Sequence, residues 1–128
     1  MLGHKIVQVF RERFEVWATV KGLFTDIERY GILEKDRIIE NVVVTDLAAV
    51  RRAITTSEPD VVINAVGVIK QLPSSKDVIN TLSVNSIFPH RLAELSEEFG
   101  FRLISVSTDC GVSARMTKLF KPLLKNTF

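Results

Sequence analysis

Strand-like and helix-like segments alternate along this chain, and no other feature limits its fold as strongly. Four segments are rich in β-branched or aromatic residues, as strands are: residues 14–20, 42–44, 61–63 and 102–107. Three stretches carry apolar side chains at helical spacing: residues 2–13, 46–57 and 74–99. Strands that alternate with helices usually pair in parallel through right-handed crossovers. The order of segments therefore predicts an α/β fold built around a parallel sheet.

The composition is that of one globular domain, with 128 residues of which 46% are apolar and 25% charged. The single cysteine, Cys110, excludes an internal disulfide framework and favours a reducing compartment. The sequence contains no apolar run long enough to span a membrane and no signal-peptide pattern at its amino terminus. We therefore expect a cytoplasmic protein without a membrane segment.

The formal charge of +2 comes from one end of the chain. Residues 111–128 contain no acidic residue and these four basic ones: Arg115, Lys118, Lys121 and Lys125. Residues 1–110 then hold 13 basic and 15 acidic residues, a net charge of −2. A basic footprint is therefore not a property of the domain, and we expect no nucleic-acid partner.

Helix-capping signals mark the ends of two of the expected helices. Asp46 can accept from the first free N–H groups of a helix that carries Leu47, Val50 and Ile54 on one face and ends at residues 57–59. Ser74, with Asp77 three residues later, resembles a capping box that opens a long helix, and Gly100 ends that helix. Its expected buried stripe consists of Leu92, Leu95 and Phe99.

A proline inside the long helix predicts a local distortion. Pro89 has no N–H, so the carbonyl of Asn85 loses its helical partner and the helix should kink there. An open carbonyl inside a protein must find water or a ligand. A kink that serves only packing is the alternative interpretation.

Polar and small residues follow the ends of the expected strands. The segments in question are residues 20–22, 45–46, 64–67 and 107–109. In an open parallel sheet, ligands bind outside the carboxyl ends of the strands, at the point where the strand order reverses. We therefore expect these segments to gather at one edge and to form the binding site.

Four strings of residues, taken together, resemble the extended short-chain dehydrogenases/reductases, in particular the dTDP-4-dehydrorhamnose reductase-like enzymes of sugar nucleotides. They occur in the family's order at residues 1–5, 59–67, 84–90 and 107–110. The resemblance implies a partial Rossmann-like, doubly wound parallel sheet that lacks its first strand. Residues 1–110 would be a partial NAD(P)-binding domain, and residues 111–128 a divergent basic tail.

The resemblance also implies a cofactor site. Gly3 matches the last glycine of the family's Gly-x-x-Gly-x-x-Gly turn, where a helix N-terminus faces the pyrophosphate; close helix–strand packing is the alternative. Lys21 follows a strand at a position where a basic residue suits a 2′-phosphate, which favours NADP and leaves NAD open, although a surface lysine needs no ligand. Asp46 resembles the family's aspartate near the adenine, but helix capping already explains it.

A second part of the implied cofactor site lies after the strand at residues 61–63. Asn64, Ala65 and Gly67 resemble the family's Asn-Ala-Ala-Gly segment, and Val66 departs from its central alanine. A tight strand exit without a ligand would use the same small residues.

The implied catalytic residues are incomplete. Thr108 occupies the place of the family's catalytic Ser/Thr, and Asn85 resembles the asparagine that helps to hold a water near the reaction centre. The family's proton-transfer pair, Tyr-x-x-x-Lys, is absent, because the only tyrosine is Tyr30 and Glu34 stands four residues later.

The resemblance thus implies an NAD(P)-dependent reductase, or an epimerase or dehydratase, acting on a nucleotide sugar. This activity is expected of an intact parent protein, which could be a homodimer, and we expect the present chain to be an inactive fragment that lacks both ends. The alternative is a non-catalytic nucleotide-binding or regulatory module. No metal site is expected. The sequence does not name the sugar, the oligomeric state or the origin of the missing ends.

Overall fold

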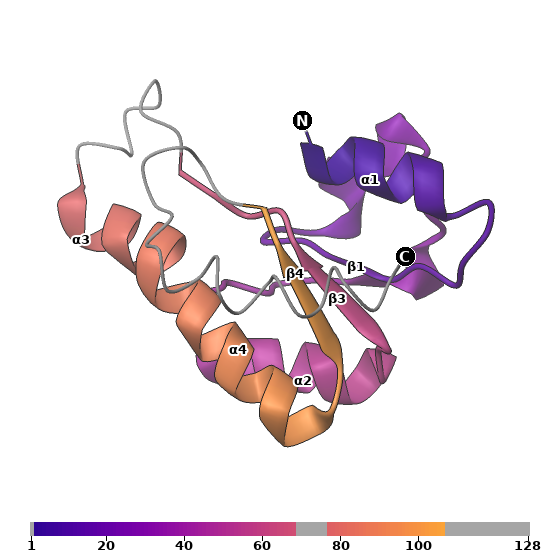
Figure 1. Ribbon diagram of the computed structural model, residues 1–128. Helices are drawn as coiled ribbons and strands as arrows, with labels where there is room; N and C mark the ends of the chain where they lie inside the picture. The colour runs from indigo at the N-terminus through magenta and orange to yellow at the C-terminus, as the bar shows by residue number, and fades with distance from the viewer. Residues whose placement is uncertain (1, 69–76, 107–128) are drawn as a thin grey trace.

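The computed structural model describes residues 2–68 and 77–106 of the chain. Its regular elements, in chain order, are α1 (Leu2–Phe10), β1 (Ala18–Thr19), β2 (Ile38–Ile39), α2 (Leu47–Ser57), β3 (Val61–Asn64), α3 (Val78–Leu82), the π-helical turn η5 (Ser83–Ile87), α4 (Phe88–Phe99) and β4 (Arg102–Ser105). Short 3₁₀ turns η1 (Phe24–Asp26), η2 (Glu28–Tyr30) and η3 (Lys35–Arg37) lie between β1 and β2. Helices α2 and α4 lie on one side of β3 and β4, and α1 lies on the other (Figure 1).

The strands form two parallel sheets of two strands each. β1 pairs with β2 from Ala18 opposite Ile38, and β3 pairs with β4 from Val61 opposite Arg102. Within the described residues, β1 and β3 do not pair with each other. A doubly wound sheet without the strand between β1 and β3 has this arrangement, and the predicted partial Rossmann-like α/β fold is confirmed.

The prediction of a strand at residues 42–44 is wrong, because the strand in this part of the chain is β2, which ends three residues before Val42. Asn41 adopts a left-handed conformation with φ of 57°, which ends the extended backbone before the valines. Val42 still donates its N–H to the carbonyl of Val20 at 2.9 Å, and its side chain is buried. The apolar residues after Asn41 therefore pack into the core as a loop.

Helix α2 begins as predicted. The carboxylate of Asp46 accepts from the backbone N–H groups of Ala48 and Ala49 at 3.1 and 3.3 Å. Glu58, with φ of 43°, ends the helix before the proline that cannot continue it. Both predicted boundaries of this helix are confirmed.

The long predicted helix is present as three consecutive pieces, α3, η5 and α4. Asp77 is itself the N-cap and accepts from the N–H of Asn80 at 3.0 Å, so the predicted capping box was wrong, and Ser74 lies outside the described residues. The distortion expected from Pro89 takes the form of the π turn, in which the N–H of Phe88 donates to the carbonyl of Ser83. Gly100 ends α4 with φ of 80°, as predicted.

The core lies between α2, α4 and the inner face of β3 and β4. Its buried residues are Val42, Ala49, Val50, Ala53, Ile54, Phe88, Leu92, Leu95, Phe101 and Leu103. Leu92 and Leu95 are buried as predicted, but Phe99 is 41% exposed. Phe101, two residues later and only 5% exposed, fills the core, while the guanidinium of Arg51 lies over the Phe99 ring.

Candidate functional site

The loop at residues 65–68 leaves the carboxyl end of β3 beside the first turn of α1. A Cβ atom built on Gly3 would lie 3.8 Å from the Cβ atom of Ala65. Two of the predicted cofactor-binding segments, far apart in sequence, are therefore neighbours at this edge. α1 has no fully buried residue, so its first turn lies against the loop at the protein surface.

Asn64 is buried and holds the start of this loop. It is 4% exposed; its Nδ2 donates to the hydroxyl of Ser105 at 3.2 Å, and its Oδ1 accepts from the N–H of Val66 at 3.1 Å. The carbonyl of Asn64 accepts from the N–H of Val106 at 2.9 Å. This asparagine therefore ties the ends of β3 and β4 together and shapes the start of the loop.

Asn85 holds the other end of the loop. Its Oδ1 accepts from the N–H of Val68 at 2.8 Å, and its Nδ2 donates to the carbonyl of Val68 at 2.9 Å. Both polar atoms of the side chain are thus engaged with one peptide backbone. The predicted contact with a catalytic water concerns the backbone carbonyl of Asn85, and it stays a prediction.

The predicted residues after β1 and β2 occupy different surroundings. Lys21 is exposed directly after β1. A Cβ atom at Gly22 would lie 2.5 Å from Oδ2 of Asp26, which accepts from the N–H of Leu23, so a larger residue there would displace this carboxylate. The sequence analysis did not single out Asp26, and no spacing motif marks a carboxylate that folds back onto a strand end. Asp46 caps α2, as described above.

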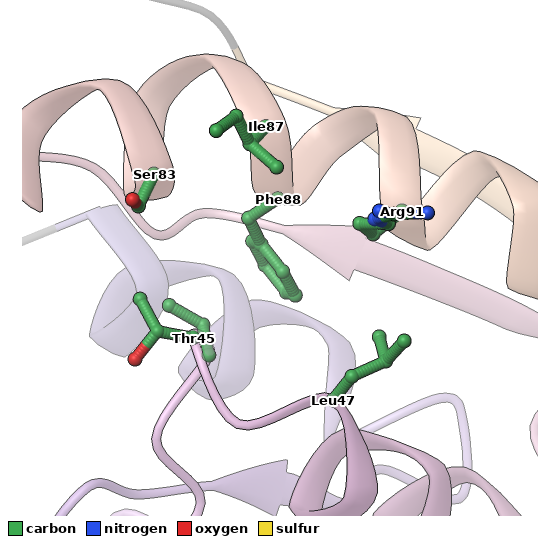
Figure 2. A pocket seen from close by; sticks show the side chains of 7 residues that line it. Thr45, Leu47, Ser83, Ile87, Phe88 and Arg91 are labelled. Carbon is green, nitrogen blue, oxygen red and sulfur yellow. The ribbon is translucent and has the colours of Figure 1, made fainter. Parts of the chain in front are cut away.

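A shallow hollow opens between the start of α2 and the η5–α4 stretch (Figure 2). Its lining residues are Val44, Thr45, Leu47, Ser83, Ile87, Phe88 and Arg91. The Phe88 ring reaches from the helix toward Thr45 and Leu47. Only residue 45 of this group lay in a predicted site segment, although Ser83, Ile87 and Arg91 recur every four residues and so share one helix face.

The chain is similar to a known protein family. A family model described as NAD dependent epimerase/dehydratase matches residues 1–121. The chain belongs to this family. The match extends beyond Cys110, where the resemblance seen in the sequence ends. A search of curated proteins finds no match.

Members of the NAD dependent epimerase/dehydratase family bind NAD(P) and act on nucleotide sugars. Gly3 and Gly67 fit such a cofactor. No described atom lies so close to either residue that a side chain would be excluded there. The nearest atom to a Cβ built on Gly67 is Oδ1 of Asn85 at 3.6 Å, and a Cβ atom at either glycine would be in ordinary van der Waals contact. Among the described residues, no atom packs closely enough to require Gly3, and a Cβ-free surface beside a helix N-terminus suits a pyrophosphate.

The predicted catalytic threonine lies outside the described residues. Thr108 therefore keeps its expected role, the orientation of a substrate oxygen, as a prediction. Tyr30 packs its ring against His4 of α1 at 5.6 Å, edge to face. This contact joins η2 to α1 and gives the only tyrosine a packing role.

The acidic residues with shifted pKa values lie away from the carboxyl ends of the strands. A hydrogen bond from Arg51 on α2 holds the pKa of Glu98, near the end of α4, below its usual value and raises the pKa of the arginine. A hydrogen bond from Arg37 likewise lowers the pKa of Glu15, which precedes β1. These pairs join elements of the scaffold.

No helix within residues 2–68 and 77–106 is long and apolar enough to cross a membrane. Among the same residues, no three His, Cys, Asp or Glu side chains come close enough to hold a metal ion together.

Proposed function

We propose that this chain forms the nucleotide-binding part of an NADP-linked oxidoreductase that acts on a nucleotide sugar, as dTDP-4-dehydrorhamnose reductase-like enzymes do. The observation that carries the proposal is the meeting of Gly3 and Ala65 at one edge, with Gly67 in the same loop. These small residues come from segments about sixty residues apart and leave backbone accessible where a pyrophosphate needs it.

Each remaining residue has a distinct part in the proposed site. The first-turn N–H groups of α1 point toward the pyrophosphate, and Lys21 pairs with the 2′-phosphate of NADP. The hollow bounded by Thr45 and Ser83 takes the base, next to the turn that Asp46 shapes. NADP supplies or accepts the hydride. Thr108 orients the sugar oxygen, and the carbonyl of Asn85 holds a water.

The 128 residues by themselves have a more limited role. They contain no Tyr-x-x-x-Lys pair, so the proton transfer of the family reaction has no donor here. We propose that this chain binds NADP(H) without turnover and that activity requires an acid/base pair from residues outside these 128. A non-catalytic nucleotide-binding or regulatory module is the second candidate, and the same missing pair favours it.

The test compares two substitutions on α1. Gly3→Ala adds a methyl group that the described fold accommodates, and because alanine is the better helix former it should stabilise the protein by up to about 1 kcal/mol. The same methyl group should weaken NADP⁺ binding by about tenfold or more, because it occupies the approach of the pyrophosphate. Val9→Ala, at a site 65% exposed near the other end of α1, is the matched control.

The two measurements are thermal unfolding and the dissociation constant for NADP⁺ by calorimetry. A more stable Gly3→Ala protein that binds less tightly, beside a Val9→Ala protein that binds normally, supports the proposal. Equal affinity for all three proteins would reject this site. For the sugar substrate, NADPH oxidation is followed with a nucleotide keto-sugar, using a version of the protein extended by a Tyr-x-x-x-Lys segment. Turnover there supports the oxidoreductase, whereas binding without turnover supports the regulatory module.

A further inference from the structure

Arg91 is the charged residue in the lining of the hollow beside the start of α2. It follows Ile87 by one helical turn, so the two side chains share a face of the η5–α4 stretch. Ile87 is 52% exposed, whereas Phe88 is only 6% exposed and forms a buried part of the lining. Thr45 and Leu47 lie on the opposite side of the hollow (Figure 2). The lining therefore combines an apolar wall with a cationic side chain.

The bond that Arg91 makes within the protein leaves most of its guanidinium available. Its Nη1 donates to Oε2 of Glu94, one turn further along α4, at 3.1 Å. The two side chains are 55% and 65% exposed, and an exposed pair of this kind contributes little to stability. A guanidinium carries five N–H donors on a flat frame, and this bond uses one of them. The remaining donors and a face of the plane can therefore serve a ligand in the hollow.

Other arginines of the chain already stack on aromatic rings of the protein. The guanidinium groups of Arg29, Arg37 and Arg51 lie 4.8, 5.3 and 5.9 Å from the centroid of an aromatic ring. Within residues 2–68 and 77–106, the guanidinium of Arg91 lies over no such ring. A guanidinium gains from a flat π system, because its charge meets the electron-rich face of the ring. A planar aromatic ligand in the hollow would give Arg91 the contact that the other three arginines find inside the protein.

We propose that Arg91 is a nucleotide-binding residue, whose guanidinium stacks on the base of the cofactor and holds it against Ile87. This inference rests on the proposed function, which puts the base in the hollow, and it names the side chain that retains the base there. A purine base is flat, so it can lie between a guanidinium and an apolar side chain while its polar edge stays in water. Loss of a stacking partner weakens the binding of a base by about fivefold or more.

Three substitutions separate stacking from charge. Arg91→Ala removes both the plane and the charge of the guanidinium. Arg91→Lys keeps the charge and an apolar stem but loses the plane, so it should bind nearly as weakly as the alanine variant. Arg52→Ala is the matched control, because Arg52 is an exposed arginine on α2 outside the lining of the hollow. All three positions are at the surface, so no variant should shift the unfolding temperature by more than about 3 °C.

The experiment measures dissociation constants of the whole chain and its variants for three compounds by calorimetry. NADP⁺ carries both halves of the cofactor, adenosine 2′,5′-bisphosphate carries the base, and nicotinamide mononucleotide lacks it. We expect Arg91→Ala and Arg91→Lys to bind NADP⁺ and adenosine 2′,5′-bisphosphate about fivefold or more weakly, and nicotinamide mononucleotide as the wild type does. The Arg52→Ala protein should bind all three compounds normally.

Several results would overturn this role of Arg91. If the wild type binds NADP⁺ and Arg91→Ala binds adenosine 2′,5′-bisphosphate equally well, the role is wrong and the proposed function stands. An Arg91→Lys protein that binds like the wild type would exclude stacking, because charge alone would suffice. An equal loss for nicotinamide mononucleotide would show that Arg91 acts on a phosphate or on the fold. If the wild type binds neither NADP⁺ nor adenosine 2′,5′-bisphosphate, the proposed function is rejected, and this inference with it.

Discussion

Replacing the helix cap Asp46 separates its two predicted roles. Asp46→Ala removes the acceptor of the N–H groups of Ala48 and Ala49 at the start of α2. Loss of an N-cap costs about 1 kcal/mol, within a range of roughly 0.5–2 kcal/mol. The lost hydrogen bonds lie next to the core, because Ala49 and Val50 of the first helical turns are buried.

For a chain of 128 residues, about 1 kcal/mol lowers the unfolding temperature by about 3–6 °C. Circular dichroism at increasing temperature measures this shift, and urea unfolding gives the free energy directly. Asp46→Asn and Asp46→Ser keep an acceptor oxygen at the cap and should recover most of the stability. If capping is the main role, NADP⁺ affinity of these two variants should stay close to that of the wild type.

Two results would refute this reasoning. An Asp46→Ala protein as stable as the wild type would show that the cap contributes little. An Asp46→Ser protein that keeps its stability but loses NADP⁺ affinity would show that the carboxylate acts mainly on the cofactor, as the resemblance to the family suggests.

Three further predictions concern the core, a surface pair and the cofactor. Leu95→Ala, at a site 1% exposed, should cost about 2–5 kcal/mol in urea unfolding, whereas Leu82→Ala, at 51% exposed, should stay within about 0.5 kcal/mol of the wild type. The pKa of Glu98 is lowered in the folded state, so its pair with Arg51 stabilises the fold above pH 4.5 and stops doing so as the pH falls; the small gap between Arg51→Ala and the wild type should vanish in acid unfolding experiments. Lys21→Glu should weaken NADP⁺ binding by about tenfold and leave NAD⁺ binding unchanged or stronger, and a parallel loss for both cofactors would place Lys21 outside the 2′-phosphate site.

The sequence predicted the parts of the fold that depend on local chemistry. The cap at Asp46, the stop at Gly100 and the positions of strands β3 and β4 follow from side chains that act within a few residues. The errors arise where a single backbone angle or a tertiary contact decides. Asn41 turns left-handed before a run of valines, and periodicity alone does not reveal such a turn. Phe99 lies on the helical stripe, but Phe101 takes the core position.

Some features of the candidate site could likewise be predicted from the sequence, and others could not. The glycine motif of the resembled family marked position 3, and the segment after a strand end marked positions 64, 65 and 67; the structure brings position 3 against position 65. The bond between Asn85 and Val68 could not be read from the sequence, because it depends on the π turn and on how the loop leaves β3. The hollow beside Thr45 likewise exists only where two distant segments pack together.

Hydrogen exchange with and without NADP⁺ tests the central claim most directly, because it locates the cofactor on the chain. We predict that NADP⁺ slows exchange at residues 2–8 of α1 and at residues 65–68, and leaves the carboxyl-terminal turn of α2 unchanged. Protection confined to the opposite edge of the sheets, or equal exchange throughout at saturating NADP⁺, would contradict the account.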